Sequence, residues 1–139
     1  MSIENEIREA SKQNGIAMNQ MVKGDASQVL ALWSHSANVT ALHPTGSREV
    51  GWDAVQASFE NFSKLASDGT FELRDQHITV AGDLAIETGT EHVKGKLGGH
   101  VYDIQPRVTN IYSKQDGGWK MIYHHSEVAP GLLEVMGKL

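Results

Sequence analysis

The chain has 139 residues and a formal net charge of -5 at pH 7, and this length predicts one domain spanning residues 1–139. No basic patch stands out, which argues against nucleic acid as the main partner, and no apolar run approaches the ~20 residues of a membrane span. The absence of cysteine excludes disulfides and thiolate chemistry. No signal peptide is visible, so we expect a cytoplasmic protein without a membrane partner.

Helices are predicted in the N-terminal half of the chain. Ser2 is a suitable N-cap for the first helix, and Gly15 in its middle predicts a bend or a break. In the third helix, Val55, Phe59 and Phe62 recur at helical spacing and form an apolar face. The expected helices are residues 2–22, 26–33 and 52–66.

Strands are predicted for most of the remaining chain. Pro44 ends the first strand, because proline cannot donate a ladder hydrogen bond, and Pro106 predicts a bulge or an edge position. Residues 132–139 form a short helix or a tail. Helices that precede an antiparallel meander predict an α+β fold with the helices packed on one face of the sheet. The expected strands are residues 38–43, 70–80, 84–94, 101–113 and 119–128, and the expected turns are 67–69, 81–83 and 116–118.

The last hairpin of the predicted sheet carries the most informative side chains. Side chains alternate across a strand, so Tyr123 and His125 share one face with Trp119 and Met121, whereas His124 lies on the other. This pattern has two interpretations. The face is either the wall of a pocket or part of a core sheet with polar residues at its rim.

The order of these elements, together with several short motifs, resembles the nuclear transport factor 2-like superfamily, in its SnoaL-like and ketosteroid-isomerase-like branch. The resemblance covers nearly the whole chain. It implies a cone-shaped, curved antiparallel sheet wrapped around about three N-terminal helices, a cystatin-like α+β barrel. It also implies a small-molecule ligand inside the cone and a homodimer. The motifs are, in chain order, Gly24-Asp25, Trp33, His43-Pro44-Thr45-Gly46-Ser47, Gly51-Trp52, Gly117-Gly118-Trp119 and His124-His125-Ser126.

The resemblance also implies roles for individual residues. In ketosteroid isomerases the general base precedes a Pro-x-Gly-Ser loop, and His43 holds that position here. Ala17 and Thr109 stand where the two oxyanion donors of that enzyme would be, so steroid isomerisation of that type is not expected. We expect His43 and His125 to be catalytic. The expected ligand-binding residues are Trp33, Phe59, Arg107, Thr109 and Tyr123.

Other interpretations of these residues stay open. Arg107 is either a ligand contact or the ion-pair partner of Glu87 or Glu91. His43 and His125 with Glu87 would be the metal-binding alternative, but no spacing motif supports it, and we expect neither a metal nor a cofactor.

These motifs and the resemblance lead to two alternative functions. The first is a small-molecule binding protein or cofactor-free enzyme of the isomerase, cyclase, dehydratase or hydrolase type. It would act on a hydrophobic or cyclic compound, with His43 as general acid/base. The alternative is a non-catalytic ligand-binding or dimerisation module of the same fold. A cavity in which His43 lies near a second polar group favours the enzyme, whereas a filled cone with His43 bound to backbone favours the module.

Overall fold

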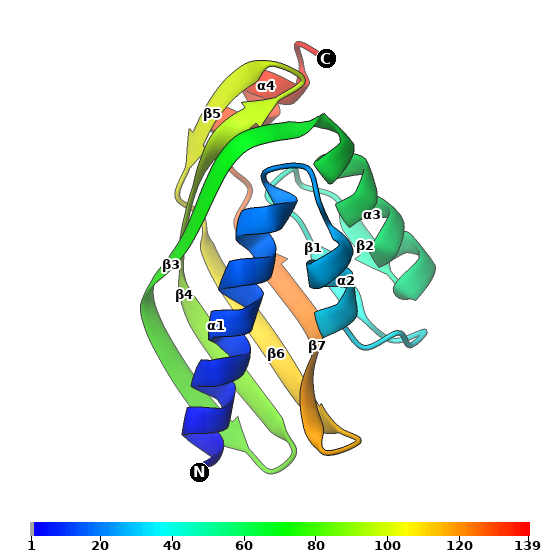
Figure 1. Ribbon diagram of the computed structural model, residues 1–139, viewed down its shortest axis with the longest axis vertical. Helices are drawn as coiled ribbons and strands as arrows, with labels where there is room; N and C mark the ends of the chain where they lie inside the picture. Colours follow the sequence, from blue (N-terminus) through cyan, green and yellow to red (C-terminus); the bar gives the residue numbers. More distant parts are fainter. Residues whose placement is uncertain (1) are drawn as a thin grey trace.

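The computed structural model describes residues 2–139, which form four helices and seven strands (Figure 1). Ser2 caps the first helix by accepting a hydrogen bond from the backbone N–H of Asn5 at 3.1 Å. This helix runs without a break through Gly15, so the expected bend is absent. The helices are α1 (Ile3–Met21), α2 (Ser27–Leu32), α3 (Trp52–Leu65) and α4 (Pro130–Met136).

The strands build one curled sheet in the order β2-β1-β7-β6-β4-β3, and β5 pairs with β4 beyond this path. All neighbours are antiparallel except β1 and β7, which run parallel and correct the expectation of a purely antiparallel sheet. The sheet does not close into a barrel. The strands are β1 (Thr40–Leu42), β2 (Arg48–Val50), β3 (Ala66–Ala81), β4 (Leu84–Leu97), β5 (His100–Ile104), β6 (Arg107–Gln115) and β7 (Gly118–Ser126).

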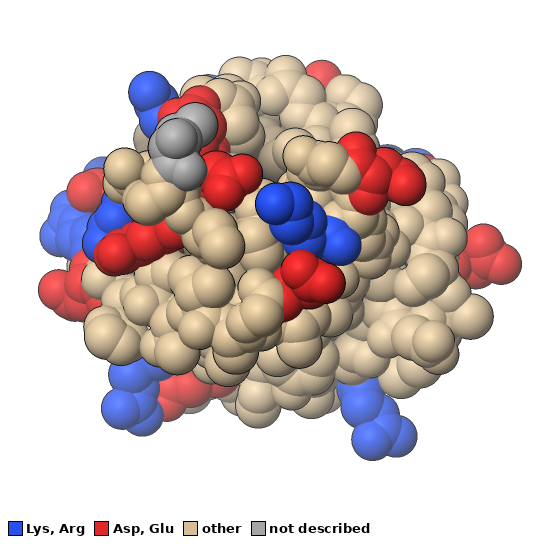
Figure 2. Space-filling view, turned by 90° about the horizontal axis from the view of Figure 1, so that it is seen from below, with Lys and Arg blue, Asp and Glu red and all other residues tan. Residues whose placement is uncertain are grey.

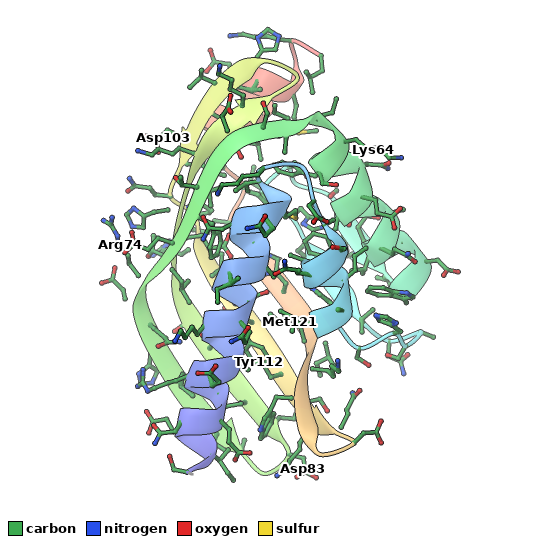
Figure 3. The ribbon with its side chains drawn as sticks, viewed as in Figure 1. Lys64, Arg74, Asp83, Asp103, Tyr112 and Met121 are labelled. Carbon is green, nitrogen blue, oxygen red and sulfur yellow. The ribbon has the colours of Figure 1, made fainter. Side chains whose placement is uncertain are left out.

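The helices cover the concave face of the sheet. In Figure 1, α1 crosses in front of β3, β4 and β6, while α2 and α3 lie over β1 and β2, and α4 lies beside β5 at the C-terminal end. Figure 3 shows Tyr112 and Met121 between α1 and the sheet, where both are 3% exposed, whereas Arg74 and Asp103 point away from the fold. The core therefore lies between this helical layer and the curled sheet.

Charged side chains are dispersed over the end of the molecule seen in Figure 2. Lysine and arginine alternate there with aspartate and glutamate, so this face carries no patch of one sign. None of the helices within residues 2–139 is both long and apolar enough to cross a membrane.

The hairpin turns lie where glycine predicted them. Asp116 and Gly117 both have positive φ, 51° and 80°, which gives a two-residue turn between Gln115 and Gly118. The expected turn at 67–69 is instead an irregularity inside β3, which starts at Ala66.

Other boundaries shift by a few residues. The expected strand 101–113 is interrupted at residues 105–106 and so divided into β5 and β6, because proline has no N–H to donate to the ladder. Both parts pair with β4, and the Pro106 carbonyl accepts from the Glu91 N–H at 2.9 Å. The loop before α3 contains the short strand β2, which was not expected. The last helix begins at Pro130, since proline is favourable in the first helical turn.

A β-bulge in β7 decides which side chains face the helices. Ile111 pairs with Tyr123 and the next residue, Tyr112, pairs with Met121, so Ile122 is an extra residue on β7. The bulge breaks the alternation assumed from the sequence. Met121 and His124 consequently both lie on the inner side, although their numbers differ by three.

Candidate functional site

A cavity of about 230 Å³ lies between the helices and the concave sheet. Met18 and Met21 of α1 line one wall, and Phe59 and Phe62 of α3 line another. The C-terminal residues Leu132, Met136 and Leu139 close the end near β5. The polar side chains that line the cavity are His43, Thr45, Ser47, Ser58, Asn61, Glu91, Tyr102 and His124.

His43 follows β1 and is held by a hydrogen bond to α3. Its Nε2 lies 2.8 Å from the Ser58 hydroxyl oxygen, and that hydroxyl donates its proton to the Val55 carbonyl at 2.7 Å. A hydroxyl has a single proton, so the Ser58 oxygen must accept from His43, and Nε2 carries the hydrogen. The other ring nitrogen, Nδ1, is therefore an unprotonated acceptor.

The environment of His43 favours its neutral form. Burial lowers the pKa of His43, and the charge of Glu49 opposes this effect without cancelling it. The ring also packs edge-on against Phe59, with centroids 5.1 Å apart. A neutral imidazole with a free nitrogen can accept a proton from a bound molecule.

His124 supplies a second imidazole to the same cavity. Its ring centroid lies 6.3 Å from that of His43, and only 8% of the residue is exposed. Burial, followed by the nearby His43 and His125, lowers the pKa of His124 to about 3. His124 is thus neutral across the physiological pH range.

Glu91 of β4 is the acidic group of the cavity. The residue is 5% exposed, and its side chain makes no hydrogen bond to another described residue. Burial, reinforced by the neighbouring carboxylate of Glu87, raises the pKa of Glu91 to about 8. Its carboxyl group is therefore largely protonated at pH 7 and can donate a hydrogen bond or a proton.

Tyr102 contributes its ring rather than its hydroxyl. The hydroxyl is buried without a partner among the described residues, and burial raises the pKa of Tyr102 to about 12. Its ring packs against Phe62 with centroids 6.4 Å apart.

The structure brings together part of the expected site. His43 and Phe59 line the cavity. Trp33 lies behind Phe59, with ring centroids 5.7 Å apart, and borders a narrow void next to His124 and Glu91.

The remaining expected residues lie on the outer face of the sheet. His125 is exposed there, with Thr109 as its partner on β6, and Tyr123 lies beside it. The bulge at Ile122 is the reason, because it turns His124 inward in place of His125. His43, His125 and Glu87 therefore do not come together, and no group of three His, Asp or Glu side chains within residues 2–139 is arranged to hold a metal ion.

Arg107 is also on the outer face, where it forms an ion pair, as one alternative expected, but with Glu127 instead of Glu87 or Glu91. Its Nε and Nη2 donate to the two carboxylate oxygens of Glu127 at 2.9 Å and 2.6 Å. This pairing lowers the pKa of Glu127 to about 2. Arg107 therefore contacts neither Glu87 nor Glu91.

Sequence reasoning missed Glu91 and ranked His124 below His125. The position of Glu91 in β4 could have indicated that it faces inward. Side chains alternate along a strand, and Glu91 lies an even number of residues from the inward-facing Ala85 and Val93. Charged residues in a strand are usually exposed, which hides this signal.

Comparisons with known proteins agree with this fold. The chain belongs to the SnoaL-like domain family, whose model matches residues 14–129. This confirms the expected placement in the SnoaL-like branch of the nuclear transport factor 2-like superfamily. No curated protein matches the sequence.

Solved structures show the same architecture. A candidate dehydratase of the nuclear transport factor 2-like family from Streptomyces avermitilis is 25% identical, with a TM-score of 0.78, and the match covers 89% of this chain and 94% of that one. A nuclear transport factor 2-like protein from Salmonella enterica is 20% identical, with a TM-score of 0.78 and 89% of each chain covered. A candidate association domain of a calcium/calmodulin-dependent protein kinase type II from Thiobacillus denitrificans is 20% identical, with a TM-score of 0.73 and coverage of 87% and 93%.

Proposed function

We propose that this protein binds a small cyclic organic compound in the cavity and transforms it by acid–base catalysis without a cofactor. The reaction class is isomerisation, cyclisation, dehydration or hydrolysis. His43 acts as the general base through Nδ1. The bond from His43 Nε2 to Ser58 carries the proposal, because it leaves Nδ1 unprotonated in a cavity with mostly apolar walls.

Glu91 completes the proposed acid–base pair. Glu91 is the proton donor, since a buried neutral carboxyl can protonate an oxygen atom that becomes negative as His43 removes a proton. The match to a candidate dehydratase agrees with this pairing, because dehydration needs both a base and an acid. His125 has no part in the proposal, since its side chain lies on the outer face.

Proton abstraction next to a carbonyl group is a step that isomerases, cyclases and dehydratases share, and it can be tested without the natural substrate. Cyclic ketones, with and without a ring hydroxyl, are incubated with the protein in deuterated water. Exchange of the hydrogen next to the carbonyl is then followed by proton NMR. We expect the wild-type protein to accelerate exchange for at least one ketone.

The variant His43→Gln is designed to separate catalysis from folding. Glutamine can still donate to Ser58 but has no basic nitrogen, so exchange should fall by roughly 10²–10⁴-fold. His125→Gln, on the outer face, is the matched control and should exchange like the wild type. Undiminished exchange in His43→Gln would contradict the role of His43. Binding without any exchange would favour the alternative, a non-catalytic ligand-binding module.

We also infer that the protein forms a homodimer through the outer face of the sheet. Ile86, Ile111 and Tyr123 lie side by side on adjacent strands of that face, and Ile86 is 37% exposed. Ile111→Arg should shift sedimentation to the monomer, whereas Val101→Arg on β5 should not. A wild-type monomer would contradict the inference. The cytoplasmic location expected from the sequence stays a prediction.

A further inference from the structure

His124 is the last member of a chain of hydrogen bonds that starts at the protein surface. Arg8 of α1 donates from Nη1 to the Gln76 side-chain oxygen at 2.9 Å, and Gln76 donates from Nε2 to Glu87 at 2.7 Å. Glu87, which is fully buried, also accepts from the Asn110 side-chain nitrogen at 2.9 Å. Asn110 Oδ1 then lies 2.6 Å from His124 Nδ1. The chain thus connects α1, β3, β4, β6 and β7.

The chemistry of its members fixes the direction of this chain. Arginine is only a donor, so the amide oxygen of Gln76 accepts and its nitrogen donates to Glu87. The Asn110 nitrogen also donates to Glu87, and the Asn110 oxygen therefore accepts from His124. Consequently Nδ1 of His124 carries the hydrogen, and Nε2 is an unprotonated acceptor.

The two free imidazole nitrogens are both open to the cavity. Among the described residues, the buried side-chain polar atoms without a partner are the Tyr102 hydroxyl and the Trp119 ring nitrogen. Nδ1 of His43 and Nε2 of His124 also lack a hydrogen-bond partner, but they do not belong to this set of fully buried atoms. Each of these two nitrogens therefore keeps some accessible surface. Both residues line the cavity and their ring centroids are 6.3 Å apart, so one bound molecule can reach both acceptors.

The charges around the cavity disfavour an anion. None of the described residues that line it is a lysine or an arginine. A carboxylate placed there would face the lone pairs of two imidazole nitrogens, without a positive group to compensate for its lost hydration. A hydroxyl group, in contrast, can donate to either imidazole nitrogen.

We propose that the cavity selects a neutral ring compound whose hydroxyl groups donate hydrogen bonds to Nδ1 of His43 and Nε2 of His124, and that it discriminates against carboxylates of the same shape. Asn110 and Glu87 are positioning residues for His124 in this proposal. The inference rests on the cavity assigned in the proposed function, but its test does not require turnover.

Three matched compounds test this selectivity at pH 7 by isothermal titration calorimetry. They are 5-propylresorcinol with two hydroxyls, 3-propylphenol with one, and 3-propylbenzoate with a carboxylate. We expect the resorcinol to bind about tenfold more tightly than the phenol, as one further hydrogen bond predicts. The benzoate should bind roughly 100-fold more weakly than the phenol or not at all. Tightest binding of the benzoate, or equal binding of all three, would overturn the proposal.

The variant His124→Phe assigns the effect to the second acceptor. It should abolish the advantage of the resorcinol while retaining binding of the phenol, and His125→Phe on the outer face should change neither affinity. An undiminished advantage in His124→Phe would contradict the proposal.

A measurement on the wild-type protein tests the tautomer directly and does not depend on a variant that folds. In ¹⁵N-edited NMR, His124 should show a protonated Nδ1 and an unprotonated Nε2, and the reverse assignment would overturn the proposal. The outcomes also separate the two hypotheses. Selectivity for the resorcinol without ketone exchange would refute catalysis alone, whereas exchange without selectivity would refute the selection rule alone.

Discussion

His124 and Glu91 occupy the same cavity, and their pKa values are shifted in opposite directions. Burial favours the neutral form of each residue, which is the deprotonated imidazole and the protonated carboxylic acid. Folding therefore couples to pH through both residues, with contributions of opposite sign. The pH dependence of wild-type stability does not reveal them separately. As the pH falls, His124 lowers the free energy of unfolding while Glu91 raises it.

Replacing His124 should make the protein relatively more resistant to acid. The unfolded state takes up a proton at His124 below pH 6.5, whereas the folded state does so only at a pH of about 3, so acid favours unfolding. Between pH 7 and pH 5 this linkage amounts to about 2 kcal/mol. Urea unfolding of His124→Gln should therefore lose that much less stability over this interval than the wild type. An unchanged pH profile would contradict the neutral state of His124.

Replacing Glu91 should have the opposite effect. The folded state protonates Glu91 below a pH of about 8 and the unfolded state only near 4.5, so acidification from pH 7 to pH 5 stabilises the wild type through this residue. In Glu91→Gln this contribution is absent. The variant should lose about 2 kcal/mol more than the wild type over the same interval in urea unfolding. Parallel profiles would show that Glu91 is ionised in the folded state.

At the scale of elements, two glycines differ in whether the fold has room for a side chain. Gly15 lies within the unbroken helix α1, and a Cβ added there meets no atom within 4 Å. Gly69 lies at an irregularity of β3, where its N–H donates to the Val22 carbonyl at 3.1 Å and its carbonyl accepts from Lys23 at 2.9 Å. A Cβ at Gly69 would collide with the backbone of Val22. Gly69 thus allows the end of α1 to approach the sheet.

The two alanine variants should change stability in opposite directions. Gly15→Ala should raise the free energy of unfolding by up to about 1 kcal/mol, since glycine weakens a helix interior. Gly69→Ala should lower it by about 1–3 kcal/mol through overpacking. Both are measured by urea unfolding of the full chain. A neutral effect at Gly69 would show that α1 and β3 can separate there without loss.

Much of the secondary structure could be predicted from the sequence. Helical spacing identified α1 and α3, and the glycine-containing turn identified the β6–β7 hairpin, because local rules determine both. The bulge at Ile122 and the irregularity before Thr70 were not visible, since they result from packing between distant segments. That single extra residue on β7 is why His125 was predicted to face the pocket when His124 does.

At the scale of the whole molecule, the cavity depends on segments from both ends of the chain. Met18 and Met21 come from α1, while Leu132 and Met136 come from α4. The position of His43 was predictable from a local motif. The acid Glu91 and the chain through Asn110 were not, because they depend on which face of β4 and β6 meets the helices.

Closure by α4 can be measured with two adjacent leucines. Leu132 is 1% exposed and lines the cavity, whereas Leu133 is 42% exposed. Leu132→Ala should lower the free energy of unfolding by about 2–5 kcal/mol, and Leu133→Ala should change it by no more than about 0.5 kcal/mol. Urea unfolding of both variants provides the comparison. Equal effects would mean that α4 does not pack over the cavity as described.

The contribution of Leu139 to the cavity wall has a practical consequence for handling the protein. An affinity tag or fluorescent label attached at this residue would extend from the wall of the cavity. The start of α1 lies at the opposite end of the molecule (Figure 1). Labels for immobilisation or single-molecule work therefore belong near the start of α1, where they stay away from the cavity.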